Sequence, residues 1–130
     1  MPPEFVVAGH IVRDVVPEGW RAGGTVTFAA VQAHRLGLSV GVVTRVGDDI
    51  DVPALLPFAE VVALPSPVST SFENVYEDGH RKQRVRARGA AIDAADVPAA
   101  WRSPRIALVG PVFGEMAPGF ARVFSEPTLT

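Results

Sequence analysis

Residues 23–49 constrain the fold of this chain more than any other stretch. A glycine pair, Gly23 and Gly24, opens the stretch, an apolar segment of helix length follows, and Gly37 separates that segment from a valine-rich run. Because glycine has no Cβ, the backbone beside the pair can approach a ligand closely. The first amides of a helix that begins at Thr25 have no partner inside the helix, so they can donate to hydroxyls or bind an anion. The order of glycine pair, helix and buried strand predicts an α/β unit with a ligand near the glycines.

Hydrophobic spacing predicts the elements around this unit. Apolar residues at intervals of three and four predict a helix over residues 25–36 that ends at Gly37. Short apolar runs are typical of buried parallel strands, and they occupy residues 5–8, 39–45, 61–64 and 106–109. Residues 11–16 are expected to be extended, and residues 18–22 to form a loop. Short helices are expected at residues 52–58 and 116–124, and no strand is expected after residue 124.

Gly47-Asp48-Asp49 predicts a turn after the second of these strands. Its two carboxylates could cap the helix near residues 52–58 or bind a metal ion. Capping is favoured, because no third ligand is in view.

Residues 70–88 form the clearest predicted hairpin of the sequence. Asp78-Gly79 is typical of a two-residue type I′ turn, which sets the register of the two strands. This register places Asn74 opposite Gln83, on a face with apolar and aromatic side chains that is suited to covering a sugar or polyol. The other face is expected to be solvated, with opposite charges paired across the strands. The basic residues of the second strand could instead contact phosphates, but nearby carboxylates and few aromatics disfavour nucleic acid.

The composition excludes several classes of function. With 130 residues, 48% of them hydrophobic, the chain is expected to be one domain with a buried core. A net charge of −2 disfavours bulk attraction to nucleic acid or to an anionic membrane. The chain has no cysteine, and no apolar run approaches the ~20 residues that span a bilayer. No signal peptide is recognised either, so a cytoplasmic location is expected.

Three motifs at fixed spacing resemble the amino-terminal signature of the ribokinase-like (PfkB) carbohydrate kinases: Gly23-Gly24, Arg35-Leu36-Gly37 and Val46-Gly47-Asp48-Asp49. Residues 5–14 resemble that family's first strand, residues 70–92 its lid, and residues 107–115 the strand and turn after the lid. The resemblance implies an incomplete ribokinase-like α/β fold over residues 1–130. We expect a mostly parallel sheet with flanking helices and a β-hairpin lid, with lid segments at about 12–22 and 69–89.

The resemblance also implies a substrate site. Asp14 is expected to hold substrate hydroxyls, whereas the residues alone leave it open as a turn-capping carboxylate. The other substrate-binding residues implied are Gly23, Gly24, Thr25, Asn74 and Gln83. Val12 and Phe28 stand where ribose-binding members carry asparagine, which argues against ribose and leaves a sugar, inositol or other polyol open. No role is assigned to Asp49 or Glu115.

Members of this family are about twice as long, and their second half carries a Gly-Ala-Gly-Asp anion hole, the catalytic aspartate and most of the ATP site. No such motif occurs in these 130 residues. The resemblance therefore implies the substrate-binding half of an ATP-dependent sugar or polyol kinase that is inactive alone. Neither a catalytic residue nor a metal ligand is assigned, and ATP and Mg²⁺ are not expected to bind tightly to this half.

Two alternatives remain open at the level of the sequence. The chain could be a non-catalytic binding or interaction module that dimerises through its lid, or it could be an incomplete reading frame of a full enzyme. A homodimer through the lid or through an exposed sheet edge is expected, because an unpaired edge and an uncovered apolar face favour association.

Overall fold

A five-stranded parallel sheet forms the centre of the molecule, of which a computed structural model describes residues 1–125 and 128–129. The strands lie in the order β5-β4-β1-β8-β9. Their bounds are β1 Phe5–Ala8, β4 Val40–Val46, β5 Glu60–Pro65, β8 Ile106–Val109 and β9 Thr128–Leu129. All four neighbouring pairs are parallel, as the continuous apolar runs predict. Both faces of such a sheet need covering.

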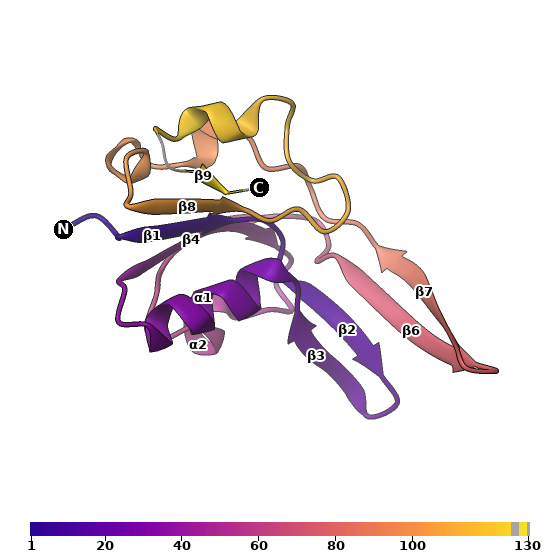
Figure 1. Ribbon diagram of the computed structural model, residues 1–130. Coiled ribbons are helices and arrows are strands. Elements are labelled where there is room, and N and C mark those ends of the chain that lie inside the picture. The colour runs from indigo at the N-terminus through magenta and orange to yellow at the C-terminus, as the bar shows by residue number, and fades with distance from the viewer. Residues whose placement is uncertain (126–127, 130) are drawn as a thin grey trace.

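Two apolar cores cover the two faces. Alternate side chains of a strand point to opposite faces, so Val7 packs beneath helix α1 (Thr25–Arg35) and helix α2 (Val52–Leu55), whereas Val6 packs on the other side. That other side is covered by the last third of the chain, which forms three short 3-10 turns (Figure 1). The turns span Ala94–Asp96, Ala99–Trp101 and Phe120–Val123. The α/β fold class expected from the sequence is confirmed.

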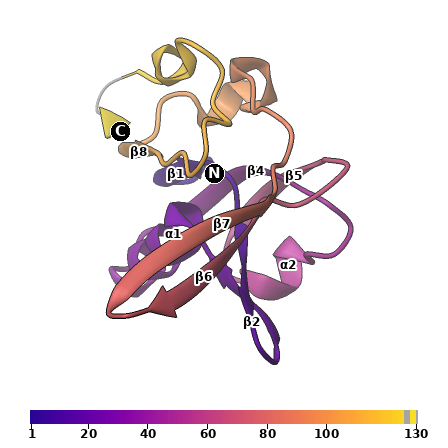
Figure 2. The same ribbon diagram turned by 90° about the vertical axis from the view of Figure 1, so that its right-hand side faces the viewer.

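A second sheet projects from the carboxyl ends of the central strands (Figures 1 and 2). Its order is β3-β2-β6-β7, with bounds β2 Val12–Val16, β3 Gly19–Gly23, β6 Ser71–Glu77 and β7 His80–Ala87. The β2–β3 and β6–β7 pairs are antiparallel hairpins, and β2 joins them by pairing parallel to β6. We call residues 71–87 the lid hairpin.

The lid hairpin has the predicted register. Asn74 pairs with Gln83, Tyr76 with Arg81 and Glu77 with His80. Asp78 and Gly79 have φ angles of 50° and 76°, as both central positions of a type I′ turn require. Helix α1 likewise ends where expected, with Gly37 at φ 85° and its N–H donating to the carbonyl of His34.

Three expectations were wrong. Residues 18–22 lie mostly in strand β3 rather than in a loop, because Gly19 at φ 141° lets the chain reverse and pair with β2. Residues 116–124 form a helical turn only at Phe120–Val123, since Gly119 is left-handed at φ 74°. A strand does follow them, as β9 pairs with β8.

The expected cap of the short helix was also wrong. Asp51, rather than Asp48 or Asp49, caps α2 by accepting a hydrogen bond from the N–H of Ala54. The helix itself begins at Val52, as expected.

Candidate substrate-binding cleft

A cleft of about 590 Å³ lies where strand β2, the start of α1 and one face of the lid hairpin meet. Its walls combine apolar and polar side chains from these three elements and from the loop after β8. The lining residues are Val12, Asp14, Gly24, Thr25, Phe28, Ala29, Phe72, Asn74, Arg81, Gln83 and Val112. Five of the six residues that the sequence analysis named for the substrate are among them, namely Asp14, Gly24, Thr25, Asn74 and Gln83.

Gly23, the sixth, lies behind the carboxylate of Asp14. A Cβ built on Gly23 would stand 2.0 Å from Oδ2 of Asp14, so no other residue fits there without moving that carboxylate. Burial raises the pKa of Asp14, and the charge of Arg81 partly offsets this effect. The glycine therefore gives Asp14 its place at the cleft.

The amino terminus of α1 opens into the same cleft. Gly24 precedes the helix at φ 88°, and no side chain caps the first turn. A Cβ on Gly24 would lie 2.8 Å from the carbonyl oxygen of His10, so the close approach of two backbone segments requires glycine here. No acidic residue occupies the first turn, and the helix dipole thus adds a partial positive charge to this side of the cleft.

The lid hairpin contributes the opposite wall. Phe72, Asn74, Arg81 and Gln83 share the face that lines the cleft, as the predicted alternation requires. The side-chain oxygen Oδ1 of Asn74 is buried and has no hydrogen-bond partner within residues 1–125 and 128–129. A buried acceptor without a partner destabilises the protein by about 1–3 kcal/mol, so it is unusual unless a ligand or a water molecule donates to it.

Phe28 stands at the mouth of the cleft. It lies in the first two turns of α1, and the residue is 65% exposed. Such an exposed ring beside polar groups provides an apolar surface against which the carbon face of a ligand can pack.

A buried histidine after strand β1 forms hydrogen bonds with the residues that flank the lid hairpin. His10 follows β1 and is fully buried. Its Nε2–H donates to the carbonyl of Ala90 at 2.7 Å, so Nδ1 accepts from the hydroxyl of Thr70, also at 2.7 Å. Thr70 in turn accepts from the N–H of Gly89. Both ends of the lid hairpin are thereby fixed to the central sheet.

Glu115 supports the same region from the loop after β8. Its carboxylate accepts hydrogen bonds from the backbone N–H groups of His10, Val112 and Phe113 at 2.9–3.1 Å. Burial would raise the pKa of Glu115, but these hydrogen bonds outweigh it and lower the pKa. Because Val112 lines the cleft, Glu115 positions the cleft wall without lining it.

Asp49 has a structural place as well. It accepts from the hydroxyl of Ser69 at 2.6 Å and forms an ion pair of 3.0 Å with Arg13. These contacts join the turn after β4 to strand β2 and to the segment before the lid hairpin. No signal in the sequence pointed to His10, whereas the Glu115 position was noted without a role.

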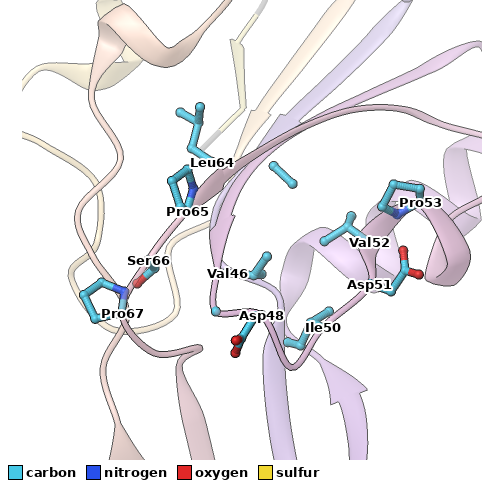
Figure 3. A pocket seen from close by; sticks show the side chains of 12 residues that line it. Val46, Asp48, Ile50, Asp51, Val52, Pro53, Leu64, Pro65, Ser66 and Pro67 are labelled. Carbon is cyan, nitrogen blue, oxygen red and sulfur yellow. The ribbon is translucent and has the colours of Figure 1, made fainter.

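A second cleft, of about 480 Å³, lies between α2 and the ends of β4 and β5 (Figure 3). Its carboxylates, Asp48 and Asp51, point in different directions, and Asp51 is already used as the helix cap. Backbone turns and prolines make up most of the remaining wall. It offers fewer convergent polar groups than the first cleft, which is therefore the better candidate.

Within the described part of the chain, no three His, Asp or Glu side chains are grouped so that they could hold a metal ion. Nor does any helix among these residues have the length and apolar character needed to cross a bilayer.

The fold matches those of several solved kinases. A pyrophosphate-dependent kinase of the ribokinase family, in a sulfate complex, has a TM-score of 0.73 and 25% identity, and the match covers 93% of this chain and 48% of that one. Such a kinase with a pyrophosphate analogue and myo-inositol has a TM-score of 0.71 and 26% identity over 92% of this chain and 44% of that one. Ribokinase from Arabidopsis thaliana, complexed with ribose and ATP, has a TM-score of 0.58 and 17% identity, and the match covers 90% of this chain and 47% of that one. No protein-family model and no curated protein matches the chain.

Proposed function

We propose a substrate-binding role for this chain, which by its fold belongs to the ribokinase-like (PfkB) kinases and spans about half the length of the solved kinases that it matches. The ligand that we infer is a sugar or polyol, held in the cleft between Asp14, the start of α1 and the lid hairpin. The chain would be the substrate-binding half of a kinase that transfers a phosphoryl group to a hydroxyl of that ligand.

The buried oxygen of Asn74 is the observation that carries this proposal. Asn74 lines the cleft, and no described residue donates a hydrogen bond to its Oδ1. Asp14 adds a second acceptor, since a carboxylate forms strong, charge-assisted hydrogen bonds with hydroxyls. Gln83 and the uncapped first turn of α1 add donors. Acceptors and donors on opposite walls of one small cleft suit a molecule with several hydroxyls.

The kinase reaction itself needs groups beyond this cleft. Phosphoryl transfer requires a base on the acceptor hydroxyl and donors that stabilise the developing negative charge. The 130 residues contain no Gly-Ala-Gly-Asp motif, and the cleft offers no cluster of carboxylates for Mg²⁺. We therefore propose that this chain alone binds substrate without turnover, and that ATP or pyrophosphate would be held by groups outside it.

Calorimetric titration with sorbitol, myo-inositol and a panel of sugars tests the binding role. Asp14→Asn should weaken binding about 10- to 100-fold, because a hydrogen bond to a charged group contributes about 1.5–3 kcal/mol. Gly23→Ala should weaken it similarly by displacing the carboxylate of Asp14. Asp48→Asn, in the other cleft, is the matched control and should bind as the parent does. Binding that is insensitive to both cleft variants would contradict the site.

Turnover is measured separately, as ADP released from ATP or phosphate released from pyrophosphate in the presence of the same ligands. Steady turnover would overturn the proposed inactivity but not the binding site. Absence of any polyol affinity would instead favour the second candidate, an interaction module that forms homodimers. The exposed apolar side chains Tyr76 on the lid hairpin and Leu36 beside the sheet edge favour that candidate.

A further inference from the structure

Arg81 is the one cation among the residues that line the candidate cleft. It lies near the tip of the lid hairpin, opposite Tyr76, and its side chain is exposed. Within the described residues it forms no ion pair, whereas two other cations of the lid hairpin have partners. Arg86 pairs with Glu73, and Lys82 pairs with Glu77. Arg81 is thus available to a ligand.

Arg81 and Asp14 face the same space without touching. Burial raises the pKa of Asp14 and the charge of Arg81 partly offsets this rise, yet within the described residues no ion pair joins the two side chains. Opposite charges that share a cleft but leave a gap can both be satisfied by one ligand between them. That ligand must present hydroxyls to Asp14 and a negative group to Arg81.

We infer that the substrate is a polyol bearing an anionic substituent, a carboxylate or a phosphate, which Arg81 binds. This inference rests on the proposed function and names the class of its substrate. The planar guanidinium donates two parallel N–H bonds to either group, a geometry that a neutral hydroxyl does not match. Repulsion by Asp14 sets the orientation, with the anion toward the lid hairpin and the hydroxyls toward Gly24 and Thr25.

Matched pairs of ligands test the inference. Sorbitol is compared with gluconate, and myo-inositol with inositol 1-phosphate, by calorimetry on the full chain. The first pair tests a carboxylate and the second a phosphate. At least one anionic member should bind about tenfold or more tightly than its neutral partner. Acetate and inorganic phosphate alone should bind weakly, because they lack the hydroxyls that Asp14 and Asn74 need.

Arg81→Met should abolish the preference for the anionic member of each pair. Arg84→Met is the control, because Arg84 lies opposite Glu73 in the strand register, does not line the cleft and should not affect the preference. A preference that survives in Arg81→Met would overturn the assignment to Arg81. Neutral members that bind as well as or better than anionic ones would overturn the substrate class but leave the proposed function intact. Failure of all four ligands to bind would contradict both.

Discussion

At the scale of single residues, His10 links stability to pH. Burial lowers the pKa of His10, and the charges of Arg88 and Arg45 add to this, while Glu115 and the bond to Ala90 oppose it. His10 therefore takes up a proton near the ordinary pKa of 6.5 in the unfolded chain, and only at lower pH in the folded protein. His10 should leave the free energy of unfolding unchanged above pH 6.5. As the pH drops below that value, it should lower the free energy of unfolding by at most about 1.4 kcal/mol per pH unit.

Urea unfolding between pH 8 and 5 measures this slope. His10→Gln should be less stable at pH 8 but should lose most of the pH dependence, whereas His34→Gln, at an exposed position, should keep it. The window stops above 4.5 because the lowered pKa of Glu115 adds its own loss of stability only below that value. An unchanged slope in His10→Gln would show that another group is responsible.

At the scale of elements, the lid hairpin depends on its turn. Gly79 has φ 76°, and a Cβ there would meet no atom within 4 Å, so Gly79→Ala introduces backbone strain without a clash. We expect it to destabilise the lid hairpin by about 1–2 kcal/mol. Asp78→Asn should be neutral or slightly stabilising, because Asn-Gly also suits a type I′ turn.

Hydrogen exchange measures the effect directly. Amides of β6 and β7 should exchange faster in Gly79→Ala, whereas those of β1, in the central sheet, should not change. Affinity for the ligand should fall with lid stability, since Asn74 and Gln83 lie on these strands. If the amides of β6 and β7 exchange no faster in Gly79→Ala than in the parent chain, the lid hairpin does not depend on its turn.

The sequence predicts those elements whose signals are local. The register of the lid hairpin follows from Asp78-Gly79, and the end of α1 follows from Gly37, because each depends on backbone conformation at one or two residues. Strand β3 was missed because its pairing with β2 outweighs a sequence that begins and ends with glycine. The helix cap was misplaced because three aspartates lie within four residues and only geometry selects Asp51.

The candidate site divides in the same way. Asp14 and Thr25 lie close in sequence to the glycine pair, of which Gly24 is a member. The resemblance to the kinase family predicts that the lid hairpin belongs to the same site. The supports of the cleft were not predicted, because His10 contacts groups 60 to 105 residues away. Arg81 lines the cleft, and its lack of an ion pair within the described residues emerges only from the folded structure.

At the scale of the whole molecule, one apolar groove remains uncovered by the described residues. It lies between α1 and the edge of the central sheet and is lined by Phe5, Ala29, Gln32, Ala33, Leu36, Leu38, Ile106 and Leu129. Leu36 is 71% exposed and Leu129 is 56% exposed. Apolar area of this kind favours contact with another apolar surface, at about 25 cal/mol per Å² removed from water.

We therefore expect the chain to self-associate as its concentration rises, with the groove of one copy against that of another. Leu36→Glu should shift sedimentation toward the monomer, because it places a charge in the groove. Tyr76→Glu, at the exposed tip of the lid hairpin, is the matched variant, since Tyr76 is 73% exposed but lies far along the chain from the groove. If only Tyr76→Glu gives monomers, the copies meet through their lid hairpins instead. A parent chain that stays monomeric at high concentration would rule out both contacts.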